Sequence, residues 1–175
     1  MALHELFRAS DLLVFLESRN SPKSAPLSLY LGGGPGTNSL GGATAENGPC
    51  TINADSNSTT LNPHSWNNHV NMLYIDQPVQ VGFSYDTIVP STVDLLTGGI
   101  LPTNESVETN GTFISGTLPS QNPTALANTT RYAVKILWKF TQIWLQDFPE
   151  HESTNDRVSV WANSVSTIID CQRDE

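Results

Sequence analysis

The sequence has few charged residues and very few basic ones. Only 14% of its 175 residues are charged, and eight Lys and Arg against seventeen Asp and Glu give a formal charge of −9. A protein that follows a phosphate backbone needs clustered basic side chains to release counterions, and the basic residues here are scattered. We therefore expect no nucleic acid partner.

Cysteines and long apolar runs are also scarce. Cys50 and Cys171 are the two cysteines. They are too few for a disulfide framework and lack metal-ligand spacing, so we expect no metal site, while a bridge between them stays open. No apolar run approaches the roughly 18 residues of a membrane span, which argues against a membrane partner. No motif indicates a cofactor or an oligomeric state.

The first nineteen residues do not have the order of a signal peptide. Acidic Glu5 and Asp11 lie where a basic and then apolar stretch is needed. Either a cytosolic protein or a start codon chosen too far downstream explains the absence of a targeting segment.

Polar uncharged residues fill much of the sequence, which suits a loop-rich extracellular surface. The N-x-S/T sequons begin at Asn57, Asn104, Asn110 and Asn128. They favour a secreted glycoprotein, although the Asn, Ser and Thr content gives almost as many sequons by chance.

The first half of the chain is typical of strands. Residues 12–17 and 27–31 are short apolar runs separated by turn-forming residues, which predicts two adjacent strands in a hairpin. Residues 70–75 predict a buried strand that ends before Pro78. Residues from about 87 to 124 have no sustained period and predict a loop-rich surface excursion without firm structure.

The second half adds a helix and a further strand. Residues 125–148 predict a helix that ends at Pro149. One face of it is expected to carry Tyr132, Ile136, Phe140, Trp144 and Phe148. Residues 158–162 predict a strand that leads directly into Asn163 and Ser164. Strand, helix and strand in this order predict an α/β fold in a single domain over residues 1–175.

Two segments could carry chemistry. The run of glycines from Gly32 to Gly36, interrupted by Pro35, lets the backbone approach a ligand, although a flexible turn explains it equally well. A phosphate loop is less favoured, because no Lys-Ser/Thr follows the glycines. Ser164 follows a strand as a nucleophile elbow requires, yet its flanks are Ala162 and Ser166 instead of glycines, and a strand-end serine that caps the next element is the alternative.

The ordered motifs together resemble the serine carboxypeptidase family. They are FLESRNSPKSAP, LYLGGGPGTNSLGG, ENGPC, LNPHSWNNHVNMLYIDQPVQVGFSYD and RVSVWANS, and they cover about residues 11–164. The family has an ESR strand, a W-L-N-G-G-P-G loop, an E-x-G-P segment, N-x-x-S-W and a stretch like IDQPVQVGFSYD before its G-x-S-Y-G elbow. The resemblance implies an α/β-hydrolase fold, with a central sheet flanked by helices.

The resemblance also implies an activity, hydrolysis of the C-terminal peptide bond of peptides and proteins through an acyl-enzyme. Ser164 matches the nucleophile, and the backbone N–H groups of Gly34 and Val165 match the oxyanion hole. The family binds the substrate's free carboxylate with a loop asparagine and two glutamates. Only Glu46 is retained here, because Gly32 and Asn163 replace the other two.

Other residues fall in segments that resemble the family's pocket floor and its neighbouring loops. They are Trp66, Asn67, Asp76, Gln77, Phe83 and Tyr85. Core packing is an equal alternative for Trp66 and Phe83, and we expect Asp76 and Tyr85 to be structural before they are chemical.

The sequence departs from the family after Ser164. A triad of this fold runs Ser, Asp, His, and the eleven residues after Ser164 contain Asp170 and Asp174 but no histidine. His4, His64, His69 and His151 all precede the serine. We therefore expect a truncated chain or a misread exon boundary, and a chain that is inactive and unstable alone.

Three functions remain open. The first is a serine carboxypeptidase lineage, and the second is a non-catalytic protein of the same fold that binds peptides or a partner. A related acyltransferase or lipase-type hydrolase is the third, which Glu46 and its ENGPC segment disfavour. The family is secreted or vacuolar, and its cysteines pair beyond this chain, which would leave Cys50 unpaired.

Overall fold

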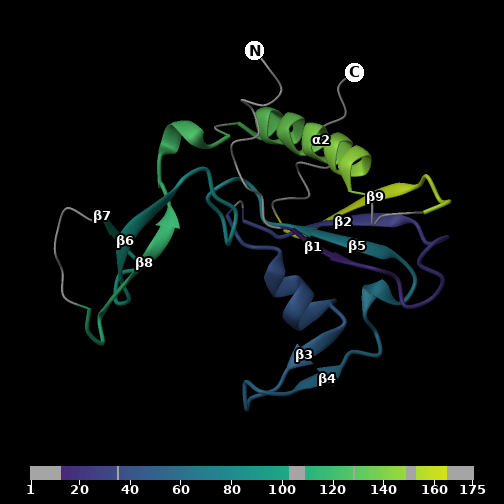
Figure 1. The fold of residues 1–175 in the computed structure, drawn as a ribbon, viewed down its shortest axis with the longest axis horizontal. Coiled ribbons are helices and arrows are strands. Elements are labelled where there is room, and N and C mark those ends of the chain that lie inside the picture. Colours follow the sequence, from purple (N-terminus) through teal and green to yellow (C-terminus); the bar gives the residue numbers. More distant parts are fainter. Residues whose placement is uncertain (1–12, 35, 103–108, 128, 149–152, 165–175) are drawn as a thin grey trace.

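The chain builds a mixed four-stranded sheet. The computed structural model describes residues 13–34, 36–102, 109–127, 129–148 and 153–164. The strands, in spatial order, are β1 (Leu13–Leu16), β5 (Asn71–Ile75), β2 (Leu27–Leu31) and β9 (Val158–Ala162). β5 and β9 both run parallel to β2, and β1 runs antiparallel to β5 (Figure 1).

The predicted hairpin between the first two strands is wrong. β5 lies between β1 and β2 and pairs with both of them. All five residues of β2 are buried, which requires a neighbour on each edge and a cover on each face. A continuous apolar run of this kind is characteristic of internal parallel strands. The strands at 70–75 and 158–162 were predicted correctly.

Helix α2 (Thr130–Asp147) covers one face of the sheet (Figure 1). Thr129 caps it, because its hydroxyl accepts a hydrogen bond from the backbone N–H of Tyr132 at 3.2 Å. Trp144 is 6% exposed and packs with Leu27, Leu29, Leu31, Leu73 and Ile75. This cluster is the larger of two apolar cores.

The predicted helix exists, but its buried face differs from the predicted one at its start. Leu137, Phe140 and Phe148 pack against the core with Trp144, whereas Tyr132 is 45% exposed. A step of four residues advances 400° around a helix of 3.6 residues per turn, or about 40° past a full turn. Over sixteen residues this drift turns Tyr132 away from the sheet.

The opposite face of the sheet carries the second core. Tyr30, Met72 and Tyr74 project from β2 and β5 to this side, where they meet Ala43. Ala43 belongs to a short π-helical turn, η1 (Gly42–Glu46). Two further elements follow below it, the hairpin of β3 (Cys50–Ile52) with β4 (Thr59–Leu61) and the 3₁₀ turn η2 (Trp66–Asn68).

Residues 88–119 contain an antiparallel three-stranded sheet in a region where the sequence predicted no strand. Its order is β7 (Ile100–Pro102), β6 (Ile88–Asp94), β8 (Phe113–Pro119). The sheet extends away from the main sheet (Figure 1). The chain enters the sheet just after Asp86 and leaves it at Ser120. The Asp86 carboxylate joins these two points, because it accepts hydrogen bonds from the hydroxyl and the backbone N–H of Ser120.

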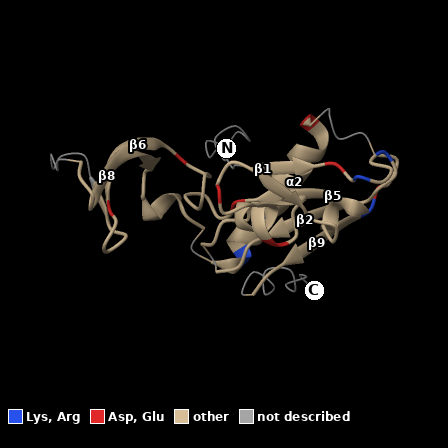
Figure 2. Cartoon of the chain, turned by 90° about the horizontal axis from the view of Figure 1, so that it is seen from below, with Lys and Arg blue, Asp and Glu red and all other residues tan. Residues whose placement is uncertain are grey.

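Charged residues are sparse along the ribbon (Figure 2). Arg19, Lys23 and Arg157 lie at the end of the main sheet where the parallel strands begin. Arg19 has a structural role, since its guanidinium donates to the carbonyl oxygens of Pro49 at 2.6 Å and Asn62 at 3.0 Å. This contact joins the exit from β1 to the segment that carries β3 and β4.

Candidate active site

Ser164 lies at the end of the main sheet where β2, β5 and β9 finish. It follows β9 by two residues and has a φ of 53°, in the left-handed region that non-glycine residues rarely adopt. Strain of this kind is typical of a serine held at a strand-to-helix turn with its hydroxyl exposed. Ser164 is exposed. The assignment of this turn as a nucleophile elbow stays a prediction, because the residues that follow Ser164 lie outside the described ones.

The glycine loop approaches Ser164 from the end of β2. A Cβ added to Gly33 would lie 2.9 Å from the Ser164 Cβ and 3.2 Å from the Asn163 carbonyl oxygen. Asn163 continues the strand pairing, because its N–H donates to the Leu31 carbonyl at 3.1 Å. The parallel pairing of β2 with β9 thus brings two segments 131 residues apart in the sequence to one place.

Gly34, one of the two expected oxyanion donors, belongs to this loop and has a φ of 123°. A side chain there would collide with the backbone nitrogens of Gly36 at 2.6 Å and Thr37 at 2.9 Å, so glycine is required. The other expected donor, Val165, lies outside the described residues.

A pocket of about 420 Å³ opens on the face of the second core, and its wall includes Asn163, the residue before Ser164. Its walls are Tyr30, Glu46, Asn47, Trp66, Trp161, Ala162 and Asn163. Glu46 and Asn163, two of the three residues expected to recognise a carboxylate, therefore lie in one cavity. Gly32, the third, is not part of its wall, and its N–H donates to Ser39 Oγ at 2.8 Å.

Tyr30 connects the two polar sides of the pocket. Its hydroxyl donates to Glu46 Oε2 at 3.5 Å and also forms a hydrogen bond with the Asn163 side chain. Burial raises the pKa of the Tyr30 hydroxyl, and the nearby Glu46 charge raises it further, while the Asn163 contact acts in the opposite direction. The hydroxyl is thus held in its protonated form, as a donor.

Three aromatic rings, those of Tyr30, Trp66 and Trp161, make up much of the wall. The Trp66 ring centroid lies 5.1 Å from that of Trp161 and 5.9 Å from that of Tyr30, and both pairs are edge-on. Trp161 is 52% exposed and Trp66 38% exposed. Sequence reasoning missed Tyr30, Asn47 and Trp161 as pocket residues. The alternation of β2 and β9 was the available signal, because Tyr30 and Trp161 are paired in register on the same face.

Asp76 is structural, as expected. It is 2% exposed and accepts hydrogen bonds from the backbone N–H groups of Ser39 at 2.6 Å and Phe83 at 3.2 Å. Its own carbonyl accepts from Ser84 Oγ at 2.6 Å. The residue thereby fixes the segment after the glycine loop to the turn after β5.

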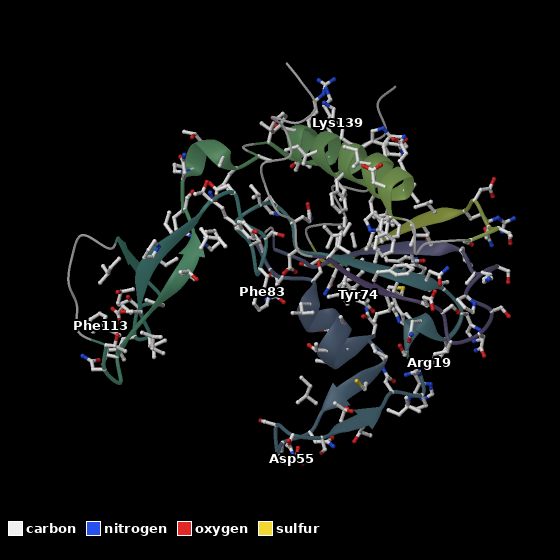
Figure 3. All side chains as sticks on the ribbon, viewed as in Figure 1. Arg19, Asp55, Tyr74, Phe83, Phe113 and Lys139 are labelled. Atoms are coloured by element: carbon white, nitrogen blue, oxygen red, sulfur yellow. The ribbon has the colours of Figure 1, made fainter. Side chains whose placement is uncertain are left out.

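Phe83 is 64% exposed and is not a core residue (Figure 3).

Asn67 is also structural. Its amide donates to the Glu17 carbonyl at 3.0 Å and accepts from Ser65 Oγ at 2.6 Å. Gln77 and Tyr85 are half-buried and do not line the pocket.

Neither of the two described histidines lines the pocket. His69 lies just before β5, at the opposite end of the parallel strands from Ser164, and His64 is exposed in the loop before η2. His4, His151, Asp170, Asp174 and Cys171 lie outside the described residues. Cys50 has no disulfide partner among the residues that the structure describes.

Among the described residues, no group of three or more His, Cys, Asp or Glu is arranged to hold a metal ion. None of the described helices has the length and apolar character needed to span a membrane.

Comparisons with known proteins agree on one family. Carboxypeptidase S1 homolog A of Arthroderma otae is 54% identical over 153 residues, which cover 86% of this chain and 24% of that protein. The carboxypeptidase Y homolog of Arthroderma benhamiae is 42% identical over 154 residues, again 86% of this chain and 24% of the relative. The chain thus spans about a quarter of the length of these relatives.

A solved structure shows the same fold. The crystal structure of Kex1Δp, a prohormone-processing carboxypeptidase from Saccharomyces cerevisiae, superposes with a TM-score of 0.58 at 23% identity, over 88% of this chain and 26% of that one. The family model for serine carboxypeptidases matches residues 12–166. The chain belongs to the serine carboxypeptidase family and has its α/β fold.

Proposed function

We propose that the whole protein hydrolyses the C-terminal peptide bond of peptides and proteins, with Ser164 as the nucleophile. The observation that carries the proposal is the left-handed backbone of Ser164 at 53°, directly against Gly33 of the glycine loop. A hydroxyl exposed on a strained turn beside a loop of backbone N–H groups is the arrangement that acyl transfer needs.

In the proposed reaction, Ser164 Oγ attacks the carbonyl carbon of the last peptide bond as its proton passes to the general base. The C–N bond then breaks, and the C-terminal residue leaves as an amine that takes up that proton. Water hydrolyses the resulting acyl-enzyme and releases the shortened peptide, which restores the Ser164 hydroxyl. The N–H groups of Gly34 and Val165 stabilise the oxyanion, and backbone donors keep this function when side chains change. We assign the general base to residues that follow Ser164 in the whole protein, because the triad of this fold runs Ser, Asp, His.

We further propose that Glu46 and Asn163 hold the free carboxylate of the substrate. Both line the pocket next to Ser164, and Tyr30 joins them through its hydroxyl. Gly32 brings no side chain, and its N–H is engaged by Ser39, so recognition falls on the other two residues. The Asn163 amide can donate to a carboxylate at any pH, whereas a carboxyl group must first be protonated.

The second candidate is a protein that binds peptide C-termini without cleaving them. It is supported by a formed pocket that neither of the two described histidines lines. The two candidates differ in one respect only, namely whether the whole protein supplies a base to Ser164.

We also propose a secreted or vacuolar location. Asn57 and Asn110, the two sequon asparagines in the described part of the chain, are both exposed and therefore accessible to a glycan. The residue types of a loop-rich polar surface support the same compartment.

The test is an assay of the longest product of the transcript on a blocked dipeptide. Release of the C-terminal residue, together with failure to cleave the same dipeptide as its amide, supports the peptidase. Binding of the free acid without release, in a protein that binds the amide poorly, supports the non-catalytic alternative. Equal affinity for acid and amide would contradict the assignment of the pocket.

A further inference from the structure

We propose that Asn110 carries an N-linked glycan, and that this glycan covers an exposed apolar tip on the small sheet. The inference rests on the secretory route proposed above, because the modifying enzyme acts on that route. The sequon Asn110-Gly111-Thr112 lies immediately before β8. Asn110 is exposed.

The two ends of the Asn110 carboxamide have different roles. Its Oδ1 accepts hydrogen bonds from the backbone N–H groups of Thr112 at 2.7 Å and Phe113 at 3.0 Å. Its own backbone N–H donates to the Phe113 carbonyl at 2.9 Å. The oxygen therefore holds the turn into β8, while Nδ2 of this exposed residue makes no hydrogen bond within the described part of the chain.

The modification is compatible with this geometry. The co-reactant is an oligosaccharide joined through its first sugar to a polyisoprenyl diphosphate. A bond forms between Nδ2 and C1 of that sugar, the bond from C1 to the diphosphate oxygen breaks, and one Nδ2 proton leaves, with no oxidation or reduction. Oδ1 remains an acceptor, so the turn keeps both of its hydrogen bonds.

The neighbouring turn is unusually apolar for an exposed site. Asp94, the last residue of β6, is paired with Phe113, and the N–H of the next residue, Leu95, donates to the Thr112 carbonyl at 2.8 Å. Leu95 is 53% exposed and Leu96 82% exposed. Phe113 marks this end of the small sheet, far from Tyr74 in the second core of the main sheet (Figure 3).

Exposed apolar side chains at a protruding sheet end promote association between molecules. A hydrated glycan that begins at Asn110 would lie over Leu95 and Leu96, because the two turns are joined by the hydrogen bond between Leu95 and Thr112. The pocket beside Ser164 is lined by other parts of the chain, so the glycan would leave it open.

The occupancy test uses the full 175-residue chain with a secretion leader in a eukaryotic host. Secreted and cell-retained material are both collected. The glycans are removed by an amidase in water labelled with heavy oxygen, which converts each glycosylated asparagine to an aspartate that carries the heavy oxygen and is recognised by its mass. We expect the mark at Asn110, its loss in Thr112→Ala and its retention in Thr112→Ser. An unmarked Asn110 in material whose leader has been cleaved would overturn the proposal.

The covering role has its own readout. Thr112→Ala should bind a hydrophobic dye more strongly and aggregate at lower concentration than Thr112→Ser, and Leu96→Ser in the Thr112→Ala background should reverse both effects. Equal dye binding by the Ala and Ser variants would refute the covering role. Neither readout requires peptidase activity, so a failed assay on the dipeptide would leave this inference intact.

Discussion

Gly33 and Ser164 are so close that a single added carbon atom at Gly33 would lie 2.9 Å from the Ser164 Cβ. Real Cβ atoms essentially never approach so closely. Ser164 has little freedom to move away, because the backbone N–H of the preceding residue, Asn163, donates a hydrogen bond to the carbonyl of Leu31 in β2. The glycine loop and the turn at Ser164 are therefore fitted to each other, and the absence of a side chain at Gly33 is a condition for the position of the hydroxyl.

Gly33→Ala in the whole protein should consequently displace Ser164 and lower kcat by about 100-fold, since a shift of about 1 Å at a reacting atom has effects of this size. Steady-state kinetics on a blocked dipeptide measure the change. Gly116→Ala is the matched control, because a Cβ at Gly116 meets nothing within 4 Å. Equal kcat for the two variants would mean that the loop does not constrain the serine.

Asn163→Glu should make substrate binding require more acidic solution. A glutamate beside the substrate carboxylate must be protonated in order to donate, and it repels the substrate once it has lost the proton. We expect KM of the free-acid dipeptide to rise more steeply with pH in the variant than in the native protein, with kcat less affected. An esterified or amidated substrate should not acquire this dependence. Superimposable pH profiles of KM would remove Asn163 from the carboxylate site.

Trp144→Ala should lower the free energy of unfolding by about 3–5 kcal/mol, the usual range for a large aromatic residue removed from a core. The Trp144 ring stacks on Phe148 at 4.9 Å and contacts Phe15 at 5.4 Å. Trp138 lies on the same helix and is 65% exposed, so Trp138→Ala is the control and should change stability by less than about 1 kcal/mol. Urea unfolding followed by circular dichroism measures both. If both variants lost a similar free energy of unfolding, Trp144 would not be a core residue.

Asp86 should make the stability of the chain depend on pH in acid. Partial burial by itself raises the pKa of this carboxyl, but hydrogen bonds from Ser120 and from the Thr87 N–H outweigh it and lower the pKa to about 2, from an ordinary 3.8. Because the folded-state pKa is lowered, the stabilisation is present above pH 3.8 and is lost as the pH falls toward 2.

Asp86→Asn should therefore flatten the decline of the urea midpoint between about pH 4 and pH 2. Asp156→Asn, at an exposed residue, should leave the decline unchanged. If the urea midpoint fell with pH in the same way in the native chain and in Asp86→Asn, the contact with Ser120 would not contribute to the pH dependence of stability.

The sequence was informative where local pattern decides the structure. The apolar runs at β5 and β9 predicted strands, and the structure has a strand at each. The pairing of strands could not be predicted in this way. β5 enters between β1 and β2 from 40 residues farther along the chain, and nothing in the local pattern of β1 distinguishes this arrangement from a hairpin.

The small sheet and the pocket escaped prediction for different reasons. Strands β6 and β8 carry Pro90 and Gly116, which local preferences associate with turns, and pairing along seven residues outweighs those preferences. Trp161 and Tyr30 become pocket residues only through the register of β2 with β9. Glu46 and Asn163, by contrast, were both identified, because the family resemblance fixes their positions in the motifs.

The most direct test of the account is covalent labelling of Ser164. The whole protein should react with a serine-directed phosphonate, the modified peptide should contain Ser164, and Ser164→Ala should abolish both labelling and release of C-terminal residues. Labelling at another serine, or peptide release that survives Ser164→Ala, would contradict the assignment of Ser164 as the nucleophile.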